Sequence, residues 1–217
     1  MTDRLPLFLL KTVLFPGMTL PLHIFEERYK LMIDHCVQQR APFGVVLIRS
    51  GEEVGAPAEP HDIGTIAHIT KLERLEDGRI NLAAVGERRF RIDRLDRSEP
   101  YLTGEVVLLN SEDRHAPETE GESVKVAALY GEQFRLVLSV TGQWVRRLSL
   151  PGEPDVLADF VAAGIEATPE TKQELLETLS VPLRLRREAE LLVEIIRKLN
   201  ERWEELQRKR FAGGGLN

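Results

Sequence analysis

The spacing of apolar residues changes character about halfway along the chain, and this change restricts the fold to one with separate β and α parts. In the first half, short apolar runs alternate with turn sequences such as Pro16-Gly17 and Asp77-Gly78. In the second half, apolar residues recur every three or four positions, as in amphipathic helices. The polar stretch 110–122 separates the two patterns. We therefore predict an α+β protein with a β-rich lobe at residues 1–118 and a helical lobe at residues 119–217.

The first lobe is predicted to contain antiparallel strands and one helix, because six or so strands in about 110 residues are typical of a barrel or a sandwich. Gly86-Glu87 is expected to form a turn between two of the strands. Asp77-Gly78 is expected to form a hairpin turn in which both central residues have positive φ. The strands are predicted at residues 5–9, 19–24, 43–48, 64–75, 80–85, 88–95 and 101–109.

The helix of this lobe is predicted over Phe25–Arg40, where apolar residues fall on one stripe. The stripe consists of Phe25, Tyr29, Met32, Ile33, Cys36 and Val37. Cys36 is the only cysteine, so no internal disulfide can form. Its place on the stripe favours a buried structural thiol over a catalytic pair with His35, because adjacent helical residues point about 100° apart.

The second lobe is predicted to be a helical bundle that ends in one long helix. Helices are expected at residues 123–140, 154–163, 168–179 and 182–210. The last has an apolar seam with alternating steps of four and three residues, the heptad spacing of packed helices. The seam consists of Leu185, Ala189, Leu192, Ile196, Leu199, Trp203 and Leu206. Its narrow end beyond Leu199 predicts a surface that could join two copies in a homodimer.

Composition limits the partners of the chain. Its net charge of −6 makes the average surface repel nucleic acid and anionic membranes. No uninterrupted apolar run approaches the roughly 18 residues that a membrane-spanning helix requires. The apolar start of the chain is not followed by a small-residue cleavage site of the kind that ends a signal peptide. We therefore expect a soluble, cytoplasmic protein without a membrane partner.

The sequence lacks the strings that identify several kinds of catalytic site. It contains no G-x-x-x-x-G-K-[ST] phosphate loop, no G-x-S-x-G nucleophile elbow and no H-E-x-x-H metal pair. His61, Asp62 and His68 are conceivable metal ligands, but so sparse a set does not favour a metal site. We expect no catalytic residues, no metal and no cofactor, and so no enzyme activity.

Two charged groups admit both a functional and a structural interpretation. Glu26 and Arg28 could clamp a ligand, but helix capping and an ion pair to a neighbouring strand are the favoured interpretation. Arg88, Arg89 and Arg91 could form an RNA-binding patch. Interleaved acidic residues and the scarcity of nearby aromatic residues favour a solvated strand face instead.

Three groups of segments occur in the order in which a known family has them. They are LPLF (5–8), LFPG (14–17) and LPLHIFEERY (20–29), then DGR (77–79) and GERRFRI (86–92), then KQELLE (172–177) and LRL (183–185). These segments resemble the N-terminal domain of Lon-type ATP-dependent proteases. The resemblance extends over nearly the whole chain, and its first group is the most specific.

The resemblance implies a fold and a function. The fold would be a PUA-like pseudo-barrel followed by a helical bundle. The function would be recognition of unfolded or degron-bearing polypeptides, with a protease or a chaperone as a further partner. A Lon protease continues into an ATPase and a serine–lysine peptidase, whereas this sequence ends at Asn217. We therefore expect a stand-alone, non-catalytic recognition module.

Several large apolar residues are candidate contacts for a bound polypeptide. They are Phe43, Phe134, Trp144, Trp203 and Leu206. Each can instead fill a core, and Trp203 is the strongest candidate because few apolar residues surround it in the sequence. Two alternative functions stay open at this point. They are an oligomerising adaptor that acts through the last helix, and a PUA-like RNA-binding protein, for which nucleic acid is the less expected partner.

Overall fold

The chain forms two compact units. The computed structural model describes residues 3–53, 58–141 and 148–213, except for the side chains of Asp3, Leu206 and residues 209–213. Unit 1 comprises residues 1–111 and 167–179, and unit 2 comprises residues 112–166 and 180–217. The predicted lobes divide the chain once, between residues 118 and 119. In the structure the chain passes between the units three times, so the helix at 169–177 belongs to the β-rich unit.

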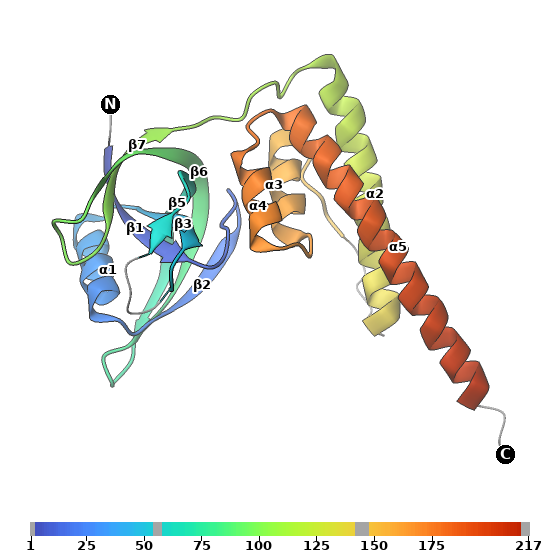
Figure 1. Cartoon of the computed structure of the whole chain (residues 1–217), viewed down its shortest axis with the longest axis horizontal. Coiled ribbons are helices and arrows are strands. Elements are labelled where there is room, and N and C mark those ends of the chain that lie inside the picture. Colours follow the sequence, from blue (N-terminus) through green and yellow to red (C-terminus); the bar gives the residue numbers. More distant parts are fainter. Residues whose placement is uncertain (1–2, 54–57, 142–147, 214–217) are drawn as a thin grey trace. The chain divides into compact units, whose positions relative to one another are not determined.

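Unit 1 is a closed barrel with additional strands and helices (Figure 1). Its elements are β1 (Asp3–Leu10), β2 (Thr19–Ile24), α1 (Glu27–Gln39), β3 (Phe43–Ser50), β4 (Glu59–Pro60), β5 (Ile63–Arg74), β6 (Ile80–Asp96), β7 (Thr103–Leu108) and α4 (Pro169–Glu177). The order β1-β7-β6-β5-β3 closes because β3 also pairs with β1. The β1–β3 pair is parallel, whereas the other pairs are antiparallel. The predicted antiparallel lobe is thus confirmed apart from one pair, which the α1 crossover makes possible.

Strand β6 organises this sheet because it is long enough to pair with three strands. Its first half, Ile80–Val85, lies between β2 and β5, whereas its second half pairs with β5 as far as Arg91 and with β7 from Phe90 to Asp96. The predicted turn at Gly86-Glu87 is wrong. Ala67 of β5 pairs with Gly86 and Ile66 pairs with Arg88, so Glu87 is the extra residue of a β-bulge.

The glycine at position 86 is required by a close approach of main chains. The Gly86 N–H donates to the Met18 carbonyl oxygen at 2.9 Å, and the Gly17 N–H donates to the Gly86 carbonyl oxygen at 2.8 Å. A Cβ at position 86 would overlap the carbonyl oxygen of Phe15. The segments 14–17 and 86–92, which are far apart in the sequence, are therefore in direct contact.

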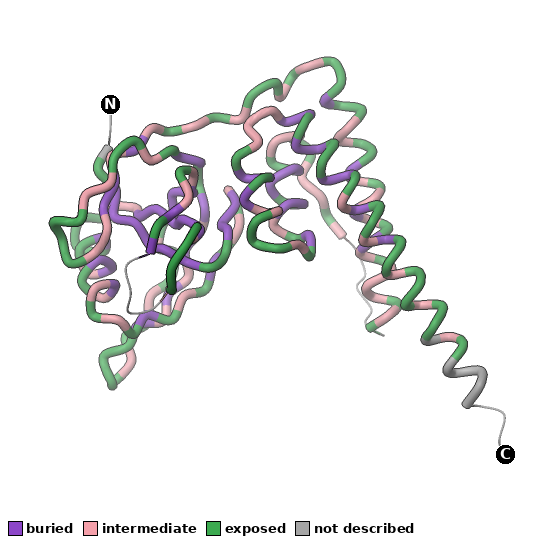
Figure 2. The backbone as a smooth tube through the Cα atoms, in the orientation of Figure 1, coloured by how far each residue is buried: buried purple, intermediate pink, exposed green. Residues whose placement is uncertain are grey.

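Both faces of β1 are buried, which explains why its sequence is apolar without alternation. Leu7 and Leu9 belong to a cluster around Phe90, whereas Phe8 and Leu10 belong to a second cluster that includes α1. Figure 2 shows the buried positions concentrated on the barrel strands of this unit.

Helix α1 packs on the sheet through four residues of the predicted stripe. These are Tyr29, Met32, Ile33 and Cys36. The prediction is wrong at both ends of the stripe. Phe25 precedes the helix with its side chain 50% exposed, and Val37 is 42% exposed.

The hairpin that joins β5 to β6 confirms the predicted turn but not its dihedral angles. Gly78 has a φ of 80°, whereas Asp77 is not among the residues with positive φ. The Gly78 N–H donates to the Leu75 carbonyl oxygen at 3.0 Å. The Asp77 carboxylate accepts the Arg79 N–H at 3.1 Å, which stabilises the turn from outside.

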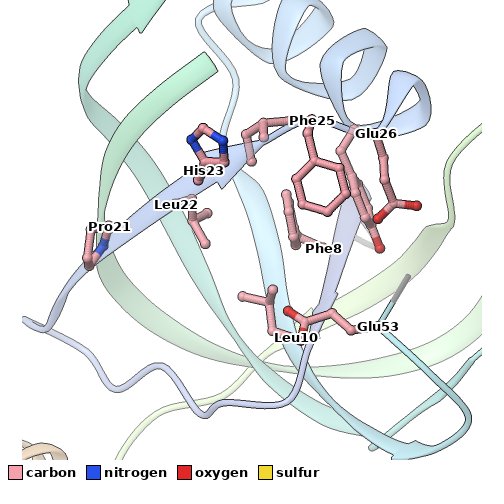
Figure 3. Close-up of a pocket in the computed structure, with 10 residues that line it drawn as sticks. Phe8, Leu10, Pro21, Leu22, His23, Phe25, Glu26 and Glu53 are labelled. Carbon is pink, nitrogen blue, oxygen red and sulfur yellow. The ribbon is translucent and has the colours of Figure 1, made fainter. Parts of the chain in front are cut away.

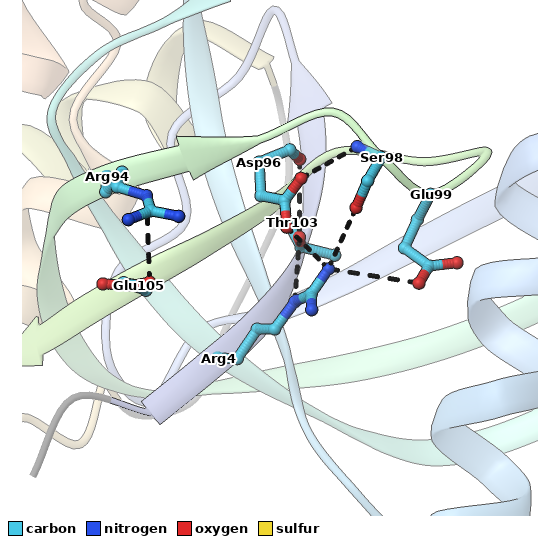
Figure 4. Close-up of polar contacts among 7 residues, drawn as sticks. All are labelled: Arg4, Arg94, Asp96, Ser98, Glu99, Thr103 and Glu105. Carbon is cyan, nitrogen blue, oxygen red and sulfur yellow. Dashed lines mark hydrogen bonds and ion pairs between the residues drawn. The ribbon is translucent and has the colours of Figure 1, made fainter.

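Polar contacts tie two further segments to the barrel. The buried Arg89 side chain donates through Nε to the carbonyl oxygen of Leu176, and Gln173 donates to that of Ile63 at 2.9 Å, so both contacts anchor α4. Arg4 of β1 reaches the end of β6, where it pairs with Asp96 at 2.9 Å (Figure 4). The pKa of Asp96 is lowered chiefly because its carboxylate accepts the Ser98 N–H.

Unit 2 consists of α2 (Pro117–Thr141), α3 (Pro154–Gly164) and α5 (Val181–Gly213). The predicted helices are confirmed, although α2 begins at Pro117 rather than Ser123. Arg186 of α5 pairs with Glu122 at 2.9 Å and with Glu118 at 4.0 Å, near the start of α2. The two long helices therefore run side by side in the same direction, as Figure 1 shows.

The core of unit 2 confirms the first part of the predicted seam. Its buried residues include Val126, Tyr130, Leu157, Val161, Leu185, Ala189, Leu192 and Ile196. Arg184 is also fully buried in this core, and its guanidinium pairs with the buried Asp159 of α3 at 3.5 Å. The predicted helical bundle thus contains a buried charge pair that the apolar spacing did not indicate.

A side chain at position 86 should destabilise unit 1. We expect Gly86→Ala to lower the free energy of unfolding by about 2–3 kcal/mol, because the new methyl group must displace the Phe15–Met18 main chain. Urea unfolding monitored by circular dichroism measures the change. Gly131→Ala is the control, since its Cβ meets no atom within 4 Å on α2 and should stabilise by about 0.5–1 kcal/mol. Equal stability of Gly86→Ala and the parent would contradict the close approach.

The Cys36 thiol should react slowly in the folded protein. Burial raises its pKa to about 11, so at pH 8 about 0.1% is the reactive thiolate. We expect slow colour development with a disulfide reagent at pH 8, faster reaction as the pH rises, and rapid reaction in urea. Because the chain has one cysteine, the signal belongs to this residue alone. Reaction of the folded protein at the rate of a free thiol would show that the packing of α1 is looser than described.

Candidate functional site

An open cleft lies where β1, β2 and the start of α1 meet in unit 1 (Figure 3). Its volume is about 290 Å³. The lining residues are Phe8, Leu10, Pro21, Leu22, His23, Ile24, Phe25, Glu26, Tyr29 and Glu53. Seven of these belong to the segment 20–29, so the most distinctive stretch of the sequence forms most of a surface cavity.

The inner wall of the cleft is aromatic and rigidly packed. The rings of Phe8 and Tyr29 are stacked, with centroids 4.0 Å apart and planes 11° from parallel. Burial raises the pKa of Tyr29, and the nearby Arg28 guanidinium opposes this shift only in part. The phenol is therefore neutral at physiological pH, and the two rings, each 5% exposed, form the core side of the cleft.

Phe25 forms the exposed rim of the cleft. It lies between β2 and α1, before the first helical residue, and is 50% exposed. The His23 ring lies 6.4 Å from the Phe25 ring, and its Nδ1 is 2.7 Å from the Asn81 side-chain oxygen. An exposed aromatic ring beside a largely apolar cavity is typical of a binding surface.

One ion pair borders the aromatic wall. Arg28 pairs with Glu26 at 3.0 Å, donates to the Glu53 carbonyl oxygen at 3.2 Å and lies over the Tyr29 ring at 4.6 Å. Glu26 is the N-cap residue of α1, but its side chain makes no capping hydrogen bond. The favoured structural interpretation is therefore wrong in both parts, because the side chain makes no cap and the ion pair joins Glu26 and Arg28 to each other rather than to a neighbouring strand.

The predicted contact residues do not gather at this cleft. Phe43 is fully buried in unit 1, next to Phe8, so its ring is a core residue that no partner reaches in this structure. Phe134 and Trp203 belong to unit 2, on α2 and α5, and both are half-buried. Trp144 and the side chain of Leu206 lie outside the described residues.

The arginine cluster does not form one basic surface. Arg89 is buried against α4, Arg88 donates to the Asn110 side chain at 2.8 Å, and Arg91 pairs with Asp93 at 3.2 Å. Each guanidinium is thus engaged in a different direction. The sequence argument for RNA binding required these three arginines to form one basic patch, and the structure does not show such a patch.

The conceivable metal ligands are engaged elsewhere. His61 lies 3.4 Å from Glu177, and His68 lies 2.5 Å from Glu87. Within residues 3–53, 58–141 and 148–213, no three histidine, cysteine or acidic side chains are placed to hold a metal ion. In the same part of the chain, every helix is too short or too polar to cross a membrane.

Sequence reasoning missed the exposed position of Phe25 at the cleft because it counted the residue as part of the helix stripe. The signal that could have separated it is its position before Glu26, which has the extended backbone of an N-cap residue. A residue before the cap does not follow the helical period. Its side chain is therefore free to lie at the surface.

Comparison with known proteins agrees with this architecture. The family model described as the ATP-dependent protease La (LON) substrate-binding domain matches residues 4–194. The chain is 30% identical over 213 residues to the Lon protease of Desulfosudis oleivorans, which covers 95% of this chain and 25% of that protein. It is 29% identical over 188 residues to the Lon protease of Methylocella silvestris, with 86% and 23% covered. The chain therefore spans about a quarter of the length of these relatives.

Solved structures show the same fold. The Lon N-terminal domain protein from Xanthomonas campestris superimposes with a TM-score of 0.64 at 27% identity, covering 85% of this chain and 96% of that chain. The N-terminal domain of the Mycobacterium avium complex Lon protease gives a TM-score of 0.66 at 23% identity, covering 88% and 98%. Together with the match of the family model over most of the sequence, these similarities show that the chain belongs to the family of Lon substrate-binding domains.

Proposed function

We propose that this chain captures unfolded or degron-bearing polypeptides without catalysing a reaction on them, in the cytoplasm and in association with a protease or a chaperone. The observation that carries the proposal is the half-exposed Phe25 ring beside the apolar cleft of the 20–29 segment. The family model supports polypeptide as the class of ligand. Phe25 is half exposed at the rim of the cleft, so an extended segment could lie across it there.

The chemistry of the cleft supports loose capture. Phe8 and Tyr29 present a stacked aromatic wall, while Glu26 and Arg28 neutralise one another at its border. Such a surface gains affinity from buried apolar area rather than from a fixed hydrogen-bond pattern. It would therefore accept many apolar segments weakly.

Removal of the Phe25 ring should weaken this binding. We expect Phe25→Ser to raise the Kd for reduced, alkylated ribonuclease A about fivefold to tenfold, because about 1–1.5 kcal/mol of apolar burial is lost. Fluorescence anisotropy of the labelled unfolded chain measures the change. Leu31→Ser is the matched control, since Leu31 is 52% exposed on α1 but does not line the cleft. Equal losses in both variants, or no binding by the parent protein, would refute the proposal.

Self-association through α5 is a second candidate function. Trp203 is half-buried within a run of charged residues. This part of the helix has three ion pairs, and each joins two residues that are four positions apart. A narrow apolar seam flanked by charges suits pairing with a second helix. We propose that such a partner, or a polypeptide, contacts Phe134, Trp203 and Leu206.

A Trp203→Ala substitution should lower the mass measured by analytical ultracentrifugation if this seam joins two copies. The expected result for the parent protein is a monomer–dimer equilibrium that shifts toward dimer at higher concentration. Arg202→Ala is the control, because Arg202 is exposed on the neighbouring helix position. If the parent protein stays monomeric at every concentration, the proposed dimer is rejected.

A further inference from the structure

The second half of β5 has an edge that no strand occupies. β3 pairs with β5 only along Thr65–Ala67, whereas β5 stays paired with β6 as far as Arg74. From His68 to Leu72, the side of β5 away from β6 therefore has no strand partner within the described part of the chain. The main-chain N–H and C=O groups along such an edge can pair with another extended chain.

A second cavity runs along this edge, and it shares no lining residue with the Phe25 cleft. Its volume is about 370 Å³, and it is bounded by residues 68–72 on one side and by the last turn of α1 on the other. Val37 is 42% exposed there, while Ile69 and Leu72 are half-buried. Apolar side chains thus lie on both walls of a groove beside an open strand edge.

The charge of this cavity is positive although the chain as a whole carries −6. Arg40 and Lys71 line it and are both exposed, and no lining residue is acidic. Among the residues that the structure describes, neither side chain has a carboxylate within ion-pair distance. By contrast, the cations Arg74 and Arg79 at the far end of the same hairpin are paired with aspartates.

The end of α1 does not cancel this charge. The carbonyl groups at a helix C-terminus normally attract cations and repel anions. Here the Arg40 N–H donates to the Val37 carbonyl oxygen at 3.3 Å, and the Ala41 N–H donates to that of Cys36 at 2.9 Å. Because these carbonyl groups are satisfied locally, the two side-chain charges dominate the cavity.

We propose that the edge His68–Leu72 binds an extended, acidic polypeptide segment by strand addition. Its carboxylates would face Arg40 and Lys71, and its apolar side chains would pack on the walls formed by Val37 and Leu72. Side chains of an extended chain alternate in direction, so one segment can make both kinds of contact. The inference rests on the proposed capture of polypeptides and adds a chemical class and a second place of contact.

Matched synthetic peptides test the charge preference. One peptide of about ten residues alternates Val and Glu, and the other has Lys in place of Glu. In fluorescence anisotropy at low salt, we expect the Glu peptide to bind and the Lys peptide not to bind. Added salt should weaken the binding, because exposed charges are screened over about 10 Å at 0.1 M. Equal binding of the two peptides overturns the proposal.

Variants of the protein locate the contact. We expect the double variant Arg40→Glu, Lys71→Glu to bind the Glu peptide about tenfold more weakly. The control Arg91→Glu, Arg94→Glu makes the same change in net charge on exposed residues of β6 and should leave the affinity within about twofold. Circular dichroism and thermal melting establish that each variant is folded. An unchanged affinity in the folded double variant overturns the proposal.

Two further measurements address strand addition itself. A Glu peptide with alternate main-chain nitrogens methylated loses hydrogen-bond donors, and we expect its binding to fall below detection. Amide resonances of residues 68–72 should shift when the unmodified Glu peptide is added. Retained binding of the methylated peptide, or displacement of the Glu peptide by single-stranded RNA through Arg40 and Lys71, overturns the assignment to an acidic strand.

The outcome is separable from that of the Phe25 cleft. Reduced, alkylated ribonuclease A is basic and reports on the apolar cleft, whereas the Glu peptide reports on the β5 edge. In one outcome, Phe25→Ser loses ribonuclease A binding while the Arg40→Glu, Lys71→Glu variant still binds the Glu peptide normally. This outcome supports the proposed function and rejects the inference about the β5 edge. Failure of the parent protein to bind ribonuclease A, with Glu-peptide binding that depends on Arg40 and Lys71, rejects capture at the cleft and supports the edge.

Discussion

The main-chain contact between Gly86 and the Phe15–Met18 segment is the constraint on which unit 1 depends. It fixes the place where β6 bulges, and the bulge lets one strand pair first with β2 and then with β7. The same segment leads directly into β2 and so determines where α1 begins. β2, which forms one wall of the Phe25 cleft, and the His68–Leu72 segment of β5 both pair with the first half of β6.

Unit 2 depends on a different kind of constraint. Arg184 and Asp159 bury opposite charges between α5 and α3, where loss of one partner costs about 3–5 kcal/mol. The pair joins α3 to α5 through side chains that are not part of the apolar seam. By contrast, the more exposed pairs of Arg186 with α2 contribute little to stability.

Local sequence patterns were sufficient for most elements and insufficient for long-range contacts. The strand β2, the helix α3 and the seam from Leu185 to Ile196 follow from residue spacing within one segment. The prediction of a turn at Gly86-Glu87 was wrong because the glycine is required by the close approach of the Phe15 main chain, about seventy residues earlier in the sequence. Burial of Phe43 and exposure of Phe25 are likewise set by which other segments cover them. Spacing within one segment does not contain that information.

The two surfaces of unit 1 differ in how they could hold a polypeptide. Covering the exposed half of Phe25 is worth about 1 kcal/mol, a change of about fivefold in Kd, so the cleft alone supports only weak binding. A free strand edge adds main-chain hydrogen bonds that do not depend on sequence, and Arg40 and Lys71 add a preference for acidic segments. When one chain reaches both surfaces, the second contact forms at a high effective concentration. Weak, separate contacts of this kind would favour long unfolded chains over folded proteins, because only an extended chain can reach both.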